Sequence, residues 1–329
     1  MNLKTVKNRP IEIEEGFILA IDFGGTKIAM ATTTLSGQRL YEAEIPTFAQ
    51  DGAQSVMRRM FEAARTLILR IDTNLGVPLR AVAAVTPGIV EADGICLAPN
   101  NPGWDTLALA DMLREGFEVE CIAVETDVKA AALAEARLGA LVGVDCGLYL
   151  NLGTGLAAAV VIHGKVLRGA HGASGEIGYQ LCGVPGEAGF AHGRAPLEEF
   201  VSGRAISDRA SALLGRPITA REAFDLSLSD PTVEALLADA LECLGTHVAN
   251  MVLLLDPSRI VLGGGMSRVA RVAVHIGTRL RTAVPYSPEI QTSAFAHGAA
   301  LAGAIVLAND AWASSRRCDK SNDRRGVLL

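Results

Sequence analysis

The sequence predicts an α/β protein made of two related halves. Residues 17–27 form an apolar run that passes directly into a glycine turn, and residues 147–155 repeat this pattern roughly one domain length later. A third glycine cluster ends a short apolar stretch at residues 256–265. Buried strands that end in glycines allow backbone N–H groups to approach an anion without interference from Cβ atoms. The repetition predicts that each half supplies a phosphate loop to a shared cleft.

The first turn has the composition of a phosphate-binding hairpin. Asp22 ends the strand and can hold a hydrated Mg²⁺ through its carboxylate. The turn offers backbone donors, a hydroxyl and a cation, from Gly24, Gly25, Thr26 and Lys27. An ordinary turn with a solvated lysine explains these four residues equally well. The turn is neither a P-loop, G-x-x-x-x-G-K-[ST], nor a Rossmann fingerprint, G-x-G-x-x-G.

The other two glycine clusters predict the rest of a nucleotide site. The second turn would contact phosphates through Gly153, Thr154 and Gly155. The third would let an adenine and a ribose lie against bare backbone at Gly263, Gly264 and Gly265.

Composition predicts an ordinary soluble enzyme. The 329 residues suffice for two domains, and 50% are hydrophobic, so a substantial core can be buried. A net charge of −6 and 5% aromatic residues argue against nucleic-acid binding. The six cysteines are scattered without a C-x-x-C pair, which is typical of reduced thiols in a cytoplasm. Residues 1–16 lack the apolar stretch of a signal peptide, and no uninterrupted apolar segment reaches the length of about 20 residues that spans a membrane.

Periodicity and turn residues predict the order of the elements. In the first half we expect strands near 17–22, 27–34, 39–46, 80–86 and 122–125, with helices over 52–75 and 129–140. In the second half we expect strands within 147–167 and at 259–262, and helices near 196–215, 231–255 and 297–312. The polar stretch from Ser314 is expected to be disordered.

Together these stretches resemble the ROK family of sugar kinases and sugar-responsive repressors. The resemblance extends from about Phe17 to about Asn309 and is carried, in order, by AIDFGGTK, VTPGIVEADG with APNNPGW, ETDVKAAALAEARLGA, NLGTGLAAAVV, GASGEIGY, LEEFVSG and IVLGGG. It implies two actin-like (ribonuclease-H-like) domains with an interdomain active-site cleft that closes on ATP and a hexose. It also implies a homodimer. The implied division is 17–127 plus 297–312 for the N-terminal domain and 128–296 for the C-terminal domain, with flexible tails at 1–16 and 313–329.

Asp127 is the candidate catalytic base. It lies where a strand passes into a helix, and a carboxylate there could accept the proton of a sugar hydroxyl. Local sequence alone favours a helix cap, whereas the resemblance implies the base of the family's E-N-D-x-N-A-A-A-L motif. Thr126 and Lys129 replace asparagines of that motif. Lys129 would lower the pKa of the aspartate if it pointed inward, but we expect it to point outward into solvent.

Sugar contacts are expected from the neighbouring motifs. Gly88 would let the backbone lie close to the sugar ring, and Asn100 could bind a vicinal diol or form an Asx turn before Pro102. The resemblance implies that Glu176 and Glu198 hold ring hydroxyls, although each alone is more typical of a surface charge.

The chain departs from the family pattern at Tyr179. Many members have a histidine there that serves both the sugar and a structural zinc, followed by a C-x-C-G-x-x-G-C cluster. Here only Cys182 of the loop could bind a metal, and His171 and His192 lack the matching spacing. We therefore predict no zinc site. The rebuilt loop leaves the acceptor open among glucose, another hexose, an amino sugar and a sugar-like cyclitol.

The resemblance implies transfer of the γ-phosphoryl group of ATP, with Mg²⁺ as cofactor, to a hydroxyl of a sugar or sugar-like polyol. The second loop reads GTGLAAA where more glycine is common, so a donor other than ATP remains open. A repressor is disfavoured because residues 1–16 show no helix-turn-helix. A sugar-binding pseudokinase is opposed by the presence of Asp22, Lys27 and Asp127. An ATPase of the chaperone or actin type remains a third alternative.

Overall fold

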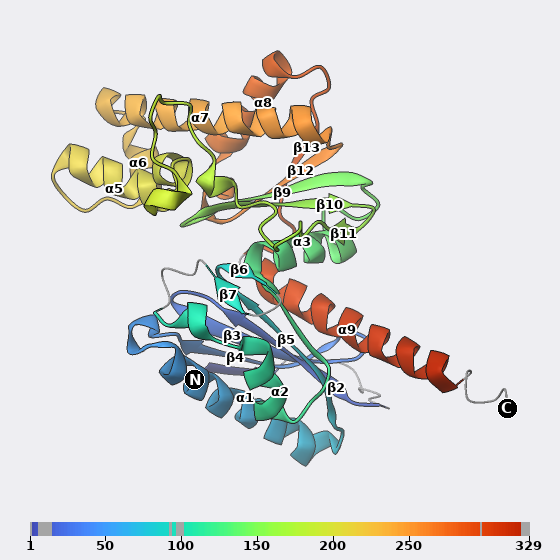
Figure 1. Ribbon diagram of the computed structural model, residues 1–329. Helices are drawn as coiled ribbons and strands as arrows, with labels where there is room; N and C mark the ends of the chain where they lie inside the picture. Colours follow the sequence, from blue (N-terminus) through green and yellow to red (C-terminus); the bar gives the residue numbers. More distant parts are fainter. Residues whose placement is uncertain (1, 6–14, 92–93, 97–101, 297, 324–329) are drawn as a thin grey trace. The chain divides into compact units, whose positions relative to one another are not determined.

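The structure is a computed structural model that describes residues 2–5, 15–91, 94–96, 102–296 and 298–323 (Figure 1). Its internal contacts divide the chain into two compact units. Unit 1 comprises residues 1–134 and 298–329, and unit 2 comprises residues 135–297.

Unit 1 is built on a six-stranded mixed sheet. In spatial order the strands are β1 (Asn2–Thr5), β4 (Arg39–Pro46), β3 (Lys27–Thr34), β2 (Phe17–Phe23), β5 (Leu79–Thr86) and β8 (Ile122–Thr126). The expected meander of β2, β3 and β4 is confirmed as two antiparallel pairs, while β2, β5 and β8 run parallel. A small hairpin of β6 (Ile89–Val90) and β7 (Ile95–Cys96) follows β5.

Helices pack against both faces of this sheet. The helices of unit 1 are α1 (Ala53–Leu75), α2 (Leu109–Phe117), the start of α3 (Asp127–Leu138) and α9 (Ala299–Asp323). Leu19 and Ile21 share a core cluster with α1 and α2, whereas Ile18 and Ala20 share another with α9. Successive side chains of a strand point to opposite faces, so a strand covered on both faces is apolar throughout. This explains the continuous apolar run of β2.

Unit 2 has a five-stranded sheet with one large core cluster. The strands in spatial order are β11 (Lys165–Val166), β10 (Leu156–Ile162), β9 (Cys146–Leu152), β12 (Arg259–Gly263) and β13 (Glu289–Thr292). The helices are α4 (Glu198–Val201), α5 (Gly203–Leu214), α6 (Ala220–Leu226), α7 (Pro231–Leu255) and α8 (Ala270–Ala283). β10 pairs antiparallel with β9, and β12 pairs parallel with β9. The buried side chains of these strands share one core cluster with α5, α6, α7 and α8.

Two expectations about the ends of the chain are wrong. Residues 314–323, which were expected to be disordered, continue the helix α9 to Asp323. No proline or glycine interrupts residues 314–323, and the hydroxyls of Ser314 and Ser315 bond carbonyls of the preceding turn. Near the other end, residues 2–5 form β1, which pairs antiparallel with β4.

Other differences concern boundaries and short elements. The helix expected at 129–140 is α3 and begins at Asp127. The helix expected at 196–215 is broken at Ser202, whose hydroxyl caps α5 by accepting the N–H of Ala205. The short helices α2 and α6, the helix α8 and the strand β13 were not expected.

Within the described part of the chain, one helix is long and apolar enough to cross a membrane by length and composition. This helix is α7, and 50% of its apolar window is buried inside the structure. Its buried residues belong to the core of unit 2. A core helix passes the same test, so this finding assigns no membrane to the chain.

Close packing of α9 against α3 in unit 1 predicts the effect of one substitution. A Cβ at Gly303 would lie 1.9 Å from the carbonyl oxygen of Ala130. We expect Gly303→Ala to destabilise the protein by about 1–3 kcal/mol, because one of the two helices must shift. Urea unfolding measures the change.

Gly277→Ala is the matched control, since this glycine also lies within a helix. Its added Cβ would meet its nearest neighbours at an ordinary 3.5 Å. We expect it to be neutral or to stabilise by up to about 1 kcal/mol through helix propensity. Equal effects of the two substitutions would contradict the packing argument.

Candidate active site

Asp22 lies near the carboxyl end of β2, beside the first glycine turn. In this turn the N–H of Gly24 donates to the carbonyl of Lys27, with an N···O distance of 3.0 Å. A Cβ at Gly24 would come within 2.8 Å of the same carbonyl oxygen, so the turn favours glycine. The hydroxyl of Thr47 donates to the carbonyl of Gly24 at 2.6 Å and ties the turn to the segment after β4.

The tip of this hairpin is exposed and consists of Gly25, Thr26 and Lys27. Nζ of Lys27 lies 2.7 Å from Oε1 of Glu44 on the neighbouring strand β4. The two side chains are 53% and 56% exposed. An ion pair this exposed contributes about 0–1 kcal/mol, so Lys27 can exchange Glu44 for a phosphate at small cost.

Asp127 is the first residue of α3 and directly follows the parallel strand β8. The helix cap is Thr126, whose Oγ1 accepts the N–H of Lys129 at 3.3 Å. Oδ1 of Asp127 accepts the N–H of Val128 at 2.8 Å. The capping bond therefore belongs to Thr126, and Asp127 does not serve α3 in that way.

The sheet of unit 1 brings Asp22 and Asp127 to the same edge. The register places Asp22 beside Val85 and Val85 beside Glu125, and Asp127 follows two residues later. Because β2, β5 and β8 are parallel, their carboxyl ends meet at one edge, where ligands of α/β sheets bind. The charge of Asp127 acts on Asp22, which indicates that the two carboxyl groups are close.

Burial dominates the electrostatics of both carboxyl groups. It raises the pKa of Asp22 to about 7, the charge of Asp127 adds to the rise, and Lys27 opposes it. Burial also raises the pKa of Asp127 above its ordinary value, while the N–H of Val128 and the ammonium of Lys129 act to lower it. Raised pKa values suit carboxyl groups that exchange protons near neutral pH.

The expectation that Lys129 points into solvent is wrong. Its side chain is only 1% exposed. The ammonium acts to lower the pKa of Asp127, two residues before it. A cation thus stands close to the candidate base, where the family pattern has an asparagine.

Trp104 joins the first glycine turn to the segment that carries Gly88. Its buried indole donates from Nε1 to Oγ1 of Thr86 at 2.6 Å and packs edge-on against Phe23, with the ring centroids 5.2 Å apart. Gly88 follows with a φ of 96°, a conformation that favours glycine. Asn100 lies outside the described residues.

In unit 2 the second glycine turn joins β9 to β10. The N–H of Gly153 donates to the carbonyl of Gly155 at 3.1 Å. The amino end of α5 is bonded to this turn, since Gly203 N–H donates to the carbonyl of Gly153 (3.0 Å) and Arg204 N–H to that of Thr154 (3.2 Å). The first N–H groups of α5 are therefore used to hold the second turn in place.

The third glycine cluster packs directly on the second turn. Gly264 has a φ of 80°, and a Cβ there would lie 2.4 Å from the carbonyl oxygen of Leu152. A Cβ at Gly263 would lie 2.0 Å from the hydroxyl oxygen of Tyr149. Gly265 has open space around it. Close packing therefore requires glycine at the first two positions, and the last one leaves backbone accessible.

A cavity of about 890 Å³ lies beside these turns, within unit 2. Gly153, Thr154 and Gly265 line it, so the structure brings the second and third clusters together. Its volume lies within the range of about 300–1,000 Å³ that is typical of small-molecule pockets. The lining also includes apolar side chains, hydroxyl groups, one carboxylate and four arginines, among them Phe224, Met266, Val269, Ser207, Thr219, Asp225, Arg204, Arg221, Arg268 and Arg271.

Sequence reasoning missed these arginines. They come from α5, α6, the segment after β12 and the start of α8, and α6 and α8 were not expected. Only Arg204 had a nearby signal, because it directly follows the glycine of the LEEFVSG stretch.

The candidate sugar residues of unit 2 lie on packed segments. Oε2 of Glu198, the first residue of α4, accepts the N–H of Leu156 at 2.8 Å. Glu176 and Tyr179 flank Gly178, where an added Cβ would approach Cβ of Glu198 to 3.1 Å. The structure thus brings the GEIGY and LEEF motifs into contact at the start of β10.

The fold defines an α/β protein with two actin-like domains. The chain belongs to the ROK family, whose model matches residues 18–311.

Several proteins of known name resemble the chain over most of its length. Kanosamine kinase from Amycolatopsis mediterranei is 30% identical over 300 residues, covering 88% of this chain and 95% of the relative. The crystal structure of a ROK hexokinase from Thermus thermophilus matches with a TM-score of 0.76 and 32% identity, covering 89% of this chain and 97% of that one. A ROK glucokinase from Streptomyces griseus, in complex with glucose and AMPPNP, matches with a TM-score of 0.68 and 25% identity, covering 90% and 100%.

The raised pKa of Asp22 predicts that replacing this carboxyl group by a neutral amide changes the stability of the protein in a pH-dependent way. Because the folded pKa is about 7 and the ordinary value is 3.8, Asp22 favours the folded state below about pH 4 and loses this contribution as the pH rises to about 7. We expect Asp22→Asn to stabilise the metal-free protein most above pH 7. Below pH 7 the difference in unfolding free energy between the variant and the wild type should shrink by up to about 1.4 kcal/mol per pH unit.

Thermal unfolding between pH 4 and pH 8, with EDTA present, measures this difference. Asp105→Asn is the control, since Asp105 is an exposed carboxylate of the same unit. A pH-independent difference between Asp22→Asn and the wild type would show that the pKa of Asp22 is not raised.

Proposed function

We propose that the chain is an ATP-dependent sugar kinase that transfers the γ-phosphoryl group to a hydroxyl of a hexose or hexose-like acceptor. The observation that carries this proposal is the placement of Asp127 and Asp22 at one sheet edge, with the helix cap assigned to Thr126. The named sugar kinases among the relatives support the same reaction class.

Asp127 is the proposed general base. Its raised pKa lets it take the proton of the acceptor hydroxyl as that oxygen attacks the γ-phosphorus. Asp22 offers the hard carboxylate oxygen that Mg²⁺ prefers, and a bound Mg²⁺ would neutralise charge on the phosphates. The backbone of Gly24, Gly25 and Thr26 and that of Gly153, Thr154 and Gly155 is proposed to contact those phosphates.

The cavity of unit 2 is the proposed nucleotide pocket. Its apolar side chains would face an adenine, and its arginines would face the phosphates. The accessible backbone of Gly265 would approach the ribose, while Gly263 and Gly264 would hold that backbone against the second turn. The AMPPNP complex of the Streptomyces griseus relative supports ATP as the donor.

The acceptor is proposed to lie against Gly88, Asn100, Glu176, Tyr179 and Glu198. Tyrosine at 179 donates one hydrogen bond and is bulkier than the histidine of many members, which favours an acceptor other than plain glucose. The name of the relative kanosamine kinase supports an amino sugar as the acceptor. A sugar-like cyclitol is the further candidate. We also propose a cytoplasmic homodimer without nucleic-acid or membrane partners.

Substitution of Asp127 is the direct test of the reaction class. Coupled ADP release is measured with Mg-ATP over a panel of hexoses, amino sugars and cyclitols. We expect at least one acceptor to stimulate turnover, and Asp127→Asn to lower that turnover by about 10²–10⁴-fold while ATP binding by calorimetry persists.

Asp105→Asn again serves as the control and should retain full turnover. If acceptors bind but none stimulates ADP release in the wild type, the chain is a sugar-binding regulator or pseudokinase. Acceptor-independent ATP hydrolysis would instead indicate an ATPase of the actin or chaperone type.

The buried cation beside the base predicts a shift in the pH profile. Lys129 lowers the pKa of Asp127, so Lys129→Gln should raise that pKa and move the acid limb of kcat/KM to higher pH. Lys165→Gln, at an exposed position of β11, should leave the limb unchanged. If the acid limb of kcat/KM is the same in the wild type, Lys129→Gln and Lys165→Gln, Lys129 does not act on the carboxyl group of Asp127.

A further inference from the structure

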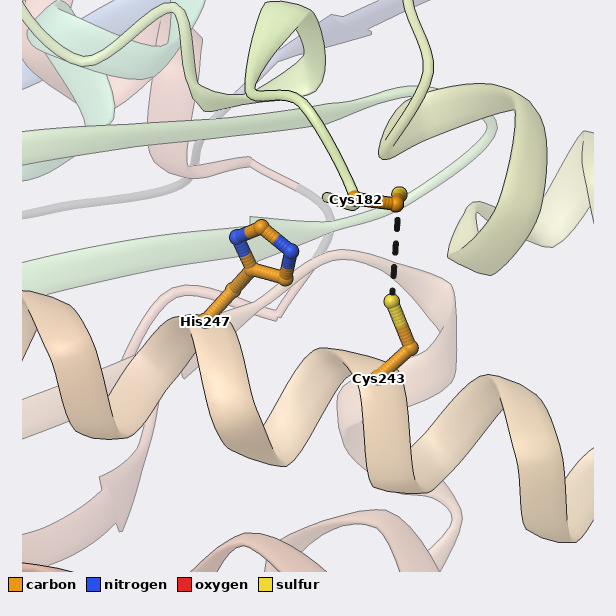
Figure 2. A group of neighbouring side chains, drawn as sticks. All are labelled: Cys182, Cys243 and His247. Atoms are coloured by element: carbon orange, nitrogen blue, oxygen red, sulfur yellow. Dashed lines mark hydrogen bonds between the residues drawn. The ribbon is translucent and has the colours of Figure 1, made fainter. Parts of the chain in front are cut away.

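Three metal-binding side chains that are distant in the sequence meet in unit 2. Cys182 follows the short helix Ile177–Tyr179, whereas Cys243 and His247 lie one turn apart on α7 (Figure 2). One ligand atom from each of the three lies within 4.8 Å of the other two, and all three side chains are partly buried. Both cysteines are free thiols.

The spacing of the two sulfur atoms fits a shared metal ion better than a disulfide. Sγ of Cys182 and Sγ of Cys243 lie 4.0 Å apart. Two thiolates on one tetrahedral Zn²⁺, each about 2.3 Å from the ion, are separated by about 3.8 Å. A disulfide would require the sulfur atoms to approach to about 2.05 Å. The observed separation therefore differs from the zinc geometry by about 0.2 Å and from the disulfide by about 2 Å.

The ring of His247 is held in the orientation that a metal ligand needs. Nδ1 of His247 lies 2.9 Å from Oε1 of Gln180. An amide oxygen only accepts, so Nδ1 carries the proton and donates it, which leaves the lone pair on Nε2. Figure 2 shows this second ring nitrogen on the side of the two sulfur atoms. Such a bond from the far nitrogen is what orients metal-binding histidines in proteins.

Nearby charges also suit a bound cation. The carboxylate of Glu187 acts electrostatically on Cys182, Cys243 and His247. Its Oε2 accepts the N–H of Cys182 at 2.8 Å, which fixes the backbone that carries this ligand.

We propose that Cys182, Cys243 and His247 bind one Zn²⁺, with water as the fourth ligand, and that this ion fastens the segment after residue 179 to α7. Each thiol releases its proton to solvent on binding, and no oxidation is involved. The site differs from the loop cluster of the family pattern, because two of its three ligands come from α7. The sequence shows no spacing typical of a zinc site, because Cys243 and His247 lie far from Cys182 in the chain.

This ion would hold Tyr179 in place next to the acceptor, a consequence that rests on the proposed function. Metal binding itself does not rest on that function, since the ligands lie within unit 2 and require no nucleotide or sugar.

The test is metal retention by the full chain, purified under reducing conditions without a metal-binding tag. After equilibration with Zn²⁺ and dialysis, we expect about one zinc per wild-type chain by mass spectrometry. Cys243→Ser and His247→Gln should lose it, and Gln180→Leu should weaken binding by about 10–100-fold. Cys146→Ser and His275→Gln, which replace a thiol and an imidazole elsewhere in unit 2, should retain it.

Cobalt provides a second readout that does not depend on any variant. Co²⁺ bound to the wild type should show thiolate-to-metal charge-transfer absorption, and Zn²⁺ should displace it. Any of three results would overturn the proposal: no zinc retained by the wild type, equal retention in the ligand variants, or a Cys182–Cys243 disulfide after purification. Loss of kinase activity with retained metal would refute the proposed function alone.

Discussion

The parallel pairing of β2, β5 and β8 is the constraint on which the candidate site of unit 1 depends. The carboxyl ends of parallel strands lie at the same edge of a sheet, and each of these three strands leads to a different part of the candidate site. β2 carries Asp22 one residue before its end and leads to the first glycine turn, β5 leads to Gly88, and β8 leads to Asp127. A slip of one residue in any pair would turn every side chain of that strand to the opposite face. The two apolar clusters on the two faces of the sheet oppose such a slip.

In unit 2 the glycine turns are positioned by close contacts between backbone segments. A Cβ added at Gly175 would lie 1.9 Å from the carbonyl oxygen of Ala158. A Cβ at Gly203 would lie 2.7 Å from the carbonyl oxygen of Gly153, and one at Gly264 would lie 2.4 Å from the carbonyl oxygen of Leu152. Only bare backbone can approach so closely, so these glycines determine how the turns stack around the cavity. The cavity wall beside the second turn is therefore set by the main chain, and four arginines contribute side chains and charge to the rest of the lining.

The strands that end in glycine turns and the long helices α1 and α7 could be predicted, because their apolar periodicity and turn residues are local signals. The short helices α2 and α6 carry too few periods for such a signal. The extension of α9 beyond Ser314 has no apolar periodicity to signal it, and its contact between Arg316 and Glu15 is remote in sequence. The burial of Lys129 and the approach of Cys243 to Cys182 are likewise products of tertiary packing. No pattern of spacing within either segment encodes them.

Thr126 and Lys129, the two residues near Asp127 that differ from the family motif, have related physical effects. Thr126 supplies the capping oxygen of α3, so the family's asparagine is not needed for that bond. Lys129 places a cation where the pattern has a neutral amide, and its charge opposes the rise in the pKa of Asp127 that burial causes. Asp22 lies close by with a pKa near 7, and the negative charge of Asp127 contributes to that value. Two enclosed carboxyl groups repel each other when both are ionised, and an enclosed cation offsets part of that repulsion. The lysine thus favours an ionised Asp127 before any metal or nucleotide binds, which is the state a base requires.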